Sequence, residues 1–252
     1  MVSKPFECYT RSDYAGYDRY DYAVGGVSCL VVAPKRALPG HPWVWVAEFF
    51  GHLPATELAL LDRGFHLAHM AVGNTFGCPD AMRQWAALYE DLTRRRGLAK
   101  RPGLMAISRG GLYAYRWAAE HPDKTACIYG DNPVCDFKSW PGGKGTGPGS
   151  PGDWAKLQAD YGFASEDDAL AYPGNPVDTL RPLADAHIPL LHVCGDADSA
   201  VPFKENTLVL QRRYEAMGGD IRVIVKPGVD HHPHGLDDPA PIVDFFVQHT
   251  RA

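Results

Sequence analysis

A serine stands at the junction of two sequence patterns in the stretch GLMAISRGGL, residues 103–112. The apolar run before it is typical of a strand buried on both faces. The segment LYAYRWAAEHP after it has the apolar spacing of a helix that stops at Pro122. A serine at such a turn can act as a nucleophile if a base takes its proton and a third group holds the base. Ser108 is therefore a candidate nucleophile.

Two later segments offer the base and the group that holds it. Asp198 follows the predicted strand PLLHVC in GDADSAVP, and His231 follows the predicted strand IRVIVK in PGVDHHPHG. All three candidates thus stand at strand ends. Their order along the chain, Ser then Asp then His, is the order that accompanies a strand-to-helix serine elbow and differs from two other serine-hydrolase orders. Together they predict acyl transfer through a serine nucleophile.

Other residues compete for two of these roles. A helix N-cap would also explain Ser108, but it would leave the positions of Asp198 and His231 unexplained. Asp196 competes as the acid, although aspartates in such turns often pin the turn itself. Asp131 competes as well, because it ends the predicted strand TACIYGD.

The histidines of the segment HHPH raise two further alternatives. His232 and His234 compete with His231 as the base. The cluster could also suggest a metal, but no HExxH motif or matching carboxylate pattern accompanies it. We therefore predict no metal site and no cofactor.

The elements that must position these residues alternate along the chain. Two strands, RYDYAV and VSCLVVAP, form an opening antiparallel pair around Gly25-Gly26. The strands that follow are WVWVAEFF, FHLAHMAV, GLMAIS, TACIYGD, PLLHVCGD and IRVIVKPG. The helices between and after them include TELALLDRG, DAMRQWAALYEDLTRRRG, ENTLVLQRRYEAMGG and PAPIVDFFVQHT. This alternation predicts an α/β fold with a largely parallel sheet covered on both faces, and ligands bind such sheets beyond the carboxyl ends of the strands.

One long segment interrupts the alternation between the predicted sixth and seventh strands. Residues 132–185 include WPGGKGTGPGSPGDW, which is too rich in Gly and Pro for a helix or central strand. A compact domain rarely keeps so long a loop without a role. We predict that the segment, with the short helix DWAKLQADYGF, forms a small cap over the site; a mobile surface loop is the alternative.

Length, composition and net charge limit the classes of protein to which the chain can belong. The chain has 252 residues, 45% of them hydrophobic and 22% charged, which suits one globular domain. A net charge of −5 argues against general nucleic-acid binding, and no apolar run is long enough to span a bilayer. The basic run Arg94–Arg96 is expected to face solvent near a helix end.

The cysteines and the first residues of the chain give indications of the cellular compartment of the protein. Of six cysteines, Cys29, Cys127 and Cys194 fall within predicted core strands, which suits buried thiols better than disulfides. The start MVSKPFECYTRSDY has no apolar core of the kind found in secretory signals. These features favour a cytoplasmic protein.

The chain resembles the α/β-hydrolase superfamily from about Tyr17 to its last helix. GDADSAVP and PGVDHHPH resemble segments of small single-domain esterases of the dienelactone-hydrolase-like or prolyl-oligopeptidase-like branch. The resemblance implies one α/β-hydrolase domain over residues 1–252, with Ser108 as nucleophile, Asp198 as acid and His231, the first histidine after the Pro-Gly turn, as base. One departure is Ala106, which stands in the first Gly position of the family's Gly-x-Ser-x-Gly elbow.

Acyl transfer also needs two N–H donors for the oxyanion that forms on the carbonyl. The elbow supplies the backbone N–H of Arg109. The second donor is expected from the loop after WVWVAEFF, where Phe49 is our prediction and Phe50 the alternative. Gly51 would let this loop approach a ligand closely.

Five residues are predicted near the mouth of the site. Glu48 and Arg109 either form an ion pair that holds the loop, or leave Arg109 to meet a substrate carboxylate or sugar hydroxyls. Trp140 could stack on a sugar ring or anchor the cap. His52 and His234 are candidate pocket residues, and a surface position is the alternative for His52.

The predicted function is a serine hydrolase that cleaves a carboxylic ester. The polar residues at the mouth favour an acylated or methyl-esterified carbohydrate, or another polar small molecule, over a long lipid chain. One alternative is a peptidase of the prolyl-oligopeptidase type, which the lack of an added propeller disfavours. Another is a non-catalytic binding protein of the same fold, which usually lacks one of the three residues. No nucleic-acid or membrane partner is predicted, and the oligomeric state is left open.

Overall fold

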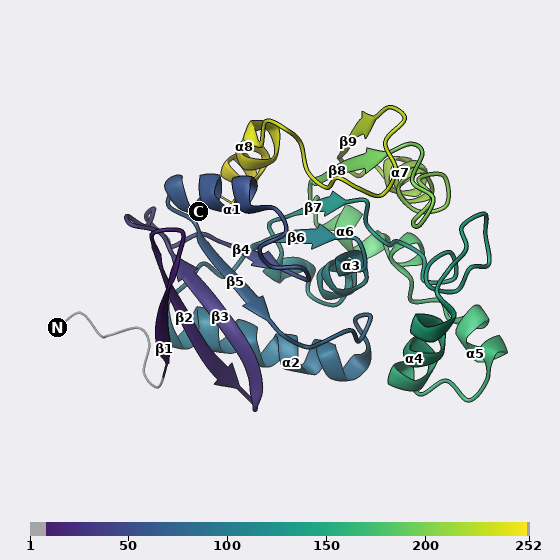
Figure 1. Cartoon of the computed structure of the whole chain (residues 1–252), viewed down its shortest axis with the longest axis horizontal. Coiled ribbons are helices and arrows are strands. Elements are labelled where there is room, and N and C mark those ends of the chain that lie inside the picture. The colour runs from purple at the N-terminus through teal and green to yellow at the C-terminus, as the bar shows by residue number, and fades with distance from the viewer. Residues whose placement is uncertain (1–8, 251–252) are drawn as a thin grey trace.

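The computed structural model describes residues 9–250, which are built around one nine-stranded sheet of order β1-β2-β3-β5-β4-β6-β7-β8-β9 (Figure 1). The strands are β1 (Thr10–Tyr14), β2 (Tyr17–Val24), β3 (Val27–Ala33), β4 (Trp43–Val46), β5 (His66–Met70), β6 (Gly103–Ile107), β7 (Cys127–Asp131), β8 (Leu190–Gly195) and β9 (Ile221–Lys226). Neighbours from β1 to β5 in this order are antiparallel, and those from β5 to β9 are parallel. The predicted fold class, α/β with a mostly parallel sheet, is confirmed.

The first strand was missed by the sequence reasoning. β1 pairs with β2 from Thr10 opposite Asp21 to Tyr14 opposite Tyr17. Four of its five residues are exposed, so no apolar alternation reveals it. Because of this extra strand, the long segment after the predicted sixth strand lies between β7 and β8.

Helices cover both faces of the sheet (Figure 1). They are α1 (Pro54–Asp62), α2 (Pro79–Glu90), α3 (Gly110–Glu120), α4 (Pro151–Tyr161), α5 (Glu166–Ala171), α6 (Arg181–Asp185), α7 (Thr207–Ala216) and α8 (Ala240–His249). Side chains of α1 and α8 belong to one buried apolar cluster, and those of α2, α3, α6 and α7 belong to another. The sheet therefore has one apolar core on each face.

The short central strand β4 shows how the sequence divides between these two cores. Trp43 and Trp45 join the cluster of α2 and α3, whereas Val44 and Val46 join that of α1 and α8. Successive side chains of a strand point to opposite faces, so an unbroken apolar run serves both cores. Trp45 stacks on Trp85 of α2 with ring centroids 4.1 Å apart. Burying an aliphatic side chain such as that of Val44 or Val46 contributes about 1.5–3 kcal/mol.

Residues 132–185 are more ordered than predicted. They contain α4, α5, α6 and a 3-10 turn at Pro176–Asp178, where one short helix was expected. Phe137, Trp154 and Leu157 of this segment pack in a third apolar cluster with Phe76 and with Leu112 of α3. In Figure 1, α4 and α5 lie on the side toward which the arrows of β6 and β7 point. The role of the segment as a cap stays a prediction.

Hydrogen bonds join this segment to the chain after β8. Ser139 Oγ donates to Glu205 Oε2 at 2.6 Å, and Thr146 donates to the other oxygen of the same carboxylate. Asn206 Oδ1 accepts the backbone N–H of Cys135 at 2.9 Å. The segment is thus attached to the residues just before α7.

The side chain of one arginine of the basic run is turned away from solvent, contrary to the prediction. The Arg96 side chain is 9% exposed, pairs with Asp91 at 2.6 Å, and lies 4.0 Å from the centroid of the Tyr22 ring. Arg94 faces solvent and pairs with Glu90. A π-helical turn at Asp91–Arg95 follows α2 directly, and Arg96 is the next residue.

The cysteines of residues 9–250 are all buried and free, as expected for Cys29, Cys127 and Cys194. Cys8 and the rest of residues 1–8, on which the secretory-signal prediction partly rests, lie outside the described residues. Over residues 9–250, no helix combines the length and apolar character needed to cross a bilayer.

Candidate active site

Ser108 lies at a strained turn between β6 and α3. It follows Ile107, the last residue of β6, and its φ of +50° is rare for a residue with a side chain. Its N–H donates to the Asp131 carbonyl at 2.9 Å, and its carbonyl accepts from the Val134 N–H at 2.8 Å. These bonds hold the strained conformation, which is the one that exposes the serine in elbow motifs.

The glycines after Ser108 have unequal steric roles. A Cβ on Gly110, the family's second Gly position, would make ordinary contacts of 3.5 Å with Ala47 and Glu48. A Cβ on Gly111 would lie 2.4 Å from the carbonyl oxygen of Val134. The close approach that requires glycine is therefore at Gly111, one residue beyond the motif.

We expect Gly111→Ala to destabilise the protein and Gly110→Ala to have little effect. Overpacking at Gly111 should cost about 1–3 kcal/mol of unfolding free energy, because backbone and not a flexible side chain must move. At Gly110 the gain in helix propensity, up to about 1 kcal/mol, offsets the new contacts. Urea denaturation of both variants measures this difference. Equal losses would place the close approach elsewhere.

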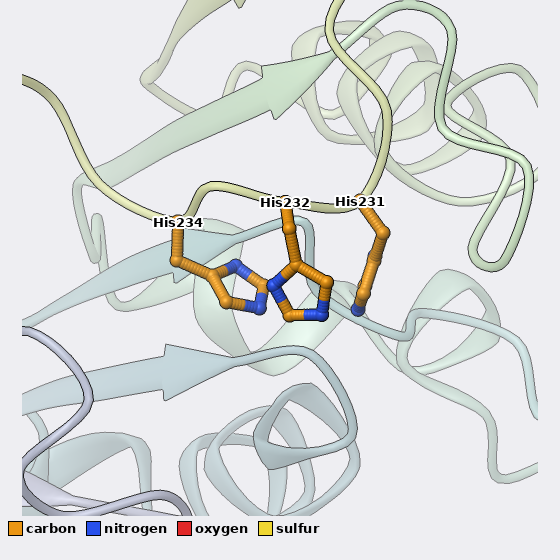
Figure 2. Close-up of side chains that lie close together, drawn as sticks. All are labelled: His231, His232 and His234. Carbon is orange, nitrogen blue, oxygen red and sulfur yellow. The ribbon is translucent and has the colours of Figure 1, made fainter.

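Three histidines follow β9 in one loop. Figure 2 shows the rings of His231, His232 and His234 pointing to the same side of the chain. His231 and His234 are partly buried, whereas His232 is exposed. Although His232 is exposed, the limited desolvation of its ring lowers its pKa, and the two neighbouring imidazoles add to this effect.

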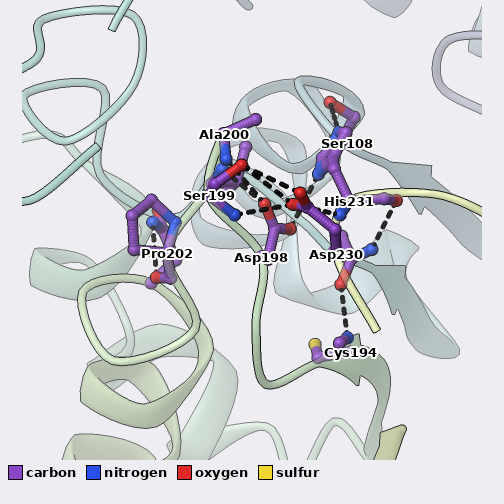
Figure 3. Close-up of polar contacts among 12 residues, drawn as sticks. Ser108, Cys194, Asp198, Ser199, Ala200, Pro202, Asp230 and His231 are labelled. Atoms are coloured by element: carbon purple, nitrogen blue, oxygen red, sulfur yellow. Dashed lines mark hydrogen bonds and ion pairs between the residues drawn. The ribbon is translucent and has the colours of Figure 1, made fainter. Parts of the chain in front are cut away.

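Ser108, His231 and Asp198 form a continuous series of hydrogen bonds (Figure 3). His231 Nε2 is 3.1 Å from Ser108 Oγ, and His231 Nδ1 is 2.7 Å from Asp198 Oδ2. A carboxylate can only accept, so it favours the tautomer with hydrogen on Nδ1 and a lone pair on Nε2 facing the serine. The other carboxylate oxygen, Oδ1, accepts the N–H groups of Ala200 and Val201 at 3.0 and 2.7 Å. The arrangement can take a proton from Ser108.

The two alternative acids lie elsewhere. Asp131 is fully buried, and its Oδ1 lies 2.7 Å from Nδ1 of His234. Its Oδ2 accepts the Gly235 N–H at 2.7 Å and the Tyr129 hydroxyl. Asp196 accepts the Gly228 N–H at 2.6 Å and so joins two turns. In the part of the chain that the structure describes, neither carboxylate is hydrogen-bonded to His231.

Two residues that the sequence reasoning missed hold the backbone of His231. Asp230 Oδ1 accepts the N–H groups of Ser199 and His231, each at 2.7 Å, and these hydrogen bonds lower the pKa of Asp230. Asn132 donates to the His231 carbonyl at 2.8 Å and accepts the Gly195 N–H at 2.9 Å. Asp230 thus joins the Asp198 loop to the His231 loop. No local pattern indicates that Asp230 meets Ser199 or that Asn132 meets His231, because these two contacts span 31 and 99 residues of the chain.

The loop after β4 carries the predicted oxyanion donors. β4 ends at Val46 and not at Phe50, because the chain turns at Phe49, whose φ is +58°. Among residues 9–250, no hydrogen bond is donated by the backbone N–H of Phe49, Phe50 or Arg109. These groups thus have no partner within the described part of the protein, as an oxyanion donor requires, and the choice between Phe49 and Phe50 stays open.

A buried carboxylate of α1, that of Glu57, holds this loop in place. Glu57 Oε1 accepts the Gly51 N–H at 2.9 Å, and Glu57 Oε2 accepts the hydroxyl of Tyr14 in β1. Burial raises the pKa of Glu57, and the hydrogen bonds counter that effect. The predicted close approach of Gly51 to a ligand is untested. The observed role of its N–H is to hold the loop.

The residues predicted at the mouth are mostly engaged with the protein itself. Arg109 Nε donates to Glu48 Oε2 at 3.1 Å, so the ion pair, one of two alternatives, is present. Burial raises the pKa of Glu48, and Arg109 opposes that shift. His52 is exposed, and Trp140 is half-buried with its ring 6.2 Å from that of Phe76. The remaining candidate is His234. Its Nδ1 is bonded to Asp131, so only its Nε2 could meet a substrate.

A cavity of about 780 Å³ lies at the opposite edge of the sheet. Its lining includes Pro42, Arg101 and Ala126, which stand just before β4, β6 and β7. Ser108 stands after the carboxyl end of β6. The cavity is therefore separate from the candidate active site.

No protein-family model and no curated protein sequence matches this chain. Solved structures do match it. Dipeptidyl peptidase 4 of Porphyromonas gingivalis aligns with a TM-score of 0.68 and 14% identity, over 94% of this chain and 36% of that one. This chain thus spans about a third of the length of that peptidase.

Two smaller proteins align over nearly their whole length. A cold-adapted esterase from an Arctic intertidal metagenomic library has a TM-score of 0.63 and 13% identity, over 97% of this chain and 100% of its own. The monoacylglycerol lipase of Paleococcus ferrophilus has a TM-score of 0.58 and 17% identity, over 88% and 99%. With the observed strand order and elbow, these likenesses show that the chain has the α/β-hydrolase fold.

Proposed function

We propose that this protein is a serine hydrolase that cleaves a carboxylic ester through an acyl-enzyme. The observation that carries the proposal is the hydrogen-bonded series Ser108, His231, Asp198 at the carboxyl edge of the sheet. A structural serine needs neither an imidazole aligned on its hydroxyl nor a carboxylate aligned on that imidazole. The strained φ of Ser108 supports the same conclusion.

The reaction follows from the geometry in two halves. Ser108 Oγ bonds to the ester carbonyl carbon while its proton passes to His231 Nε2, and the ester C–O bond then breaks as that proton moves to the leaving alcohol. A water molecule next attacks the acyl carbon, gives its proton to Nε2, and Ser108 leaves with that proton as the acid is released. Asp198 stays ionised and stabilises the imidazolium in both halves.

Each tetrahedral intermediate places negative charge on the former carbonyl oxygen. The backbone N–H groups of Arg109 and Phe49, with Phe50 as the alternative, are proposed to bind that oxygen. Removing one such donor typically costs about 10²–10³ in kcat. Protein groups supply every proton transfer and charge in this scheme, so we propose no cofactor for hydrolysis.

A polar ester is the substrate class we favour, for example an acylated or methyl-esterified carbohydrate. His52 is exposed beside the Phe49 ring, and the Arg109 guanidinium lies 4.8 Å from the centroid of that ring. Such surroundings suit hydroxyl or carboxylate groups better than a long acyl chain.

The test combines covalent labelling with a substrate panel. Folded protein is treated with a fluorophosphonate, and the labelled peptide is identified by mass spectrometry. Aryl esters of increasing acyl length, acetylated and methyl-esterified sugars, and dipeptidyl anilides are then compared by kcat/KM. We expect an adduct on Ser108 and the highest kcat/KM for short polar esters. No adduct would support a binding protein, and preferential cleavage of anilides would support a peptidase.

A further inference from the structure

The three histidines after β9 bring nitrogen ligand atoms close together. One nitrogen from each of His231, His232 and His234 lies within 4.8 Å of the other two. The ring centroids are 4.6 to 5.1 Å apart, and all three rings point the same way from the loop (Figure 2). Imidazole is a preferred ligand of Zn²⁺, and three histidines with one open position form a known type of zinc site.

Two of these rings are oriented as zinc ligands usually are. His231 bonds Asp198 through Nδ1, and His234 bonds Asp131 through Nδ1, each at 2.7 Å. A histidine that ligates a metal almost always donates its other ring N–H to a carboxylate or carbonyl, which makes it a better ligand. Both carboxylates are buried, and both rings thus present Nε2. This pairing is the observation that separates the cluster from a chance group of surface histidines.

The third ring is free to complete the site. Among residues 9–250, His232 makes no hydrogen bond, and it is exposed. Tetrahedral Zn²⁺ with bonds of about 2.0–2.1 Å needs nitrogens roughly 3.4 Å apart, so the cluster must contract. Rotation of the His232 ring, which no hydrogen bond within residues 9–250 holds, would provide most of this movement. The ammonium of Lys226, the last residue of β9, is held by the carbonyls of Pro233 and Gly235 on either side of His234.

We propose that His231, His232 and His234 form an inhibitory Zn²⁺ site. The metal takes the Nε2 lone pairs of His231 and His234 and one ring nitrogen of His232, and water fills the fourth position. No proton is lost, because the bonded nitrogens are unprotonated in the tautomers that the two carboxylates favour. The Ser108 hydroxyl then loses its acceptor, since His231 Nε2 is the atom that would take its proton.

This inference rests on the proposed function for its inhibitory effect, but metal binding itself does not. A zinc site here differs from the prediction from sequence, which was no metal site because no carboxylate pattern accompanies HHPH. The carboxylates come from residues about thirty and one hundred positions away, Asp198 and Asp131. Spacing along the chain therefore could not reveal them.

Zinc binding is tested first, without reference to activity. The full chain is freed of metal with a chelator, and Zn²⁺ is titrated by calorimetry. We expect one ion per chain, at least about tenfold weaker binding in His232→Gln, and a loss of about 10–100-fold in Asp131→Asn, which removes the carboxylate behind His234. His187→Asn, at an exposed histidine outside the cluster, should bind as the wild type does. Wild-type affinity in His232→Gln, or no stoichiometric binding, would overturn the site.

Inhibition is tested separately with the best ester of the panel. Saturating Zn²⁺ should abolish turnover by the wild type, and chelator should restore it. His232→Gln should need at least tenfold more Zn²⁺ than the wild type to lose half of its own metal-free rate. Full activity of a zinc-saturated enzyme would show that the metal does not take His231. If the metal-free wild type has no activity, the proposed hydrolase function fails. Whether the metal binds Nε2 of His231 is then tested with Ser108→Ala. This variant should bind Zn²⁺ more tightly, because the hydroxyl no longer competes for Nε2.

Discussion

Ser108→Ala is expected to lose at least about 10³-fold in kcat/KM for ester hydrolysis, or about 4 kcal/mol of transition-state stabilisation. The variant keeps the oxyanion donors and the binding surface, so a small residual rate over water should remain. Its fold should persist, because among residues 9–250 the hydroxyl is hydrogen-bonded only to the ring of His231, and the elbow is held by backbone hydrogen bonds to Asp131 and Val134. Steady-state kinetics and urea denaturation of the same preparation measure both effects.

A second serine serves as the control. Ser165 caps α5 through a hydrogen bond from the Asp168 N–H, and within residues 9–250 its side chain makes no hydrogen bond to the proposed machinery. Ser165→Ala should therefore keep its kcat/KM even if it loses about 1 kcal/mol of stability. Substantial turnover by Ser108→Ala would place the nucleophile elsewhere, and the fluorophosphonate adduct would then identify it.

Asp198→Asn is expected to lose about 10⁴-fold in kcat, by analogy with the same change in other Ser-His-Asp enzymes. An amide in place of the carboxylate can donate to Nδ1 of His231, and that favours the tautomer with hydrogen on Nε2. Such a ring cannot accept the proton of Ser108. The amide also stabilises the imidazolium less than a carboxylate does.

Asp131→Asn is the matched comparison for this variant. Asp131 is also buried and also bonded to a histidine Nδ1, but its partner is His234. We expect a loss of no more than about tenfold in kcat, because the series through His231 and Asp198 is untouched. Denaturation curves are needed for both variants, since a buried carboxylate that accepts several hydrogen bonds also supports the fold. A larger kinetic loss at Asp131 than at Asp198 would show that the acid has been placed after the wrong strand.

The order of strands and helices, and the positions of Ser108, Asp198 and His231 at strand ends, could be predicted from sequence alone. Apolar runs, helical spacing and turn residues are local signals, because neighbouring residues decide them. Parallel strands carry their carboxyl ends to one edge of a sheet, so three polar residues after three such strands were expected to meet. The exposed strand β1 carries no such signal and was missed.

Which carboxylate holds which histidine was decided only by the tertiary structure. Asp131 and Asp198 were both candidates for His231, and the fold pairs one with His234 and the other with His231. The same holds for Gly111, which requires glycine because the carbonyl of Val134 approaches it. These contacts depend on the relative positions of loops that follow different strands. Sequence periodicity places a residue at the end of a strand, but the direction of its side chain is set by packing and hydrogen bonds with chain far away in the sequence.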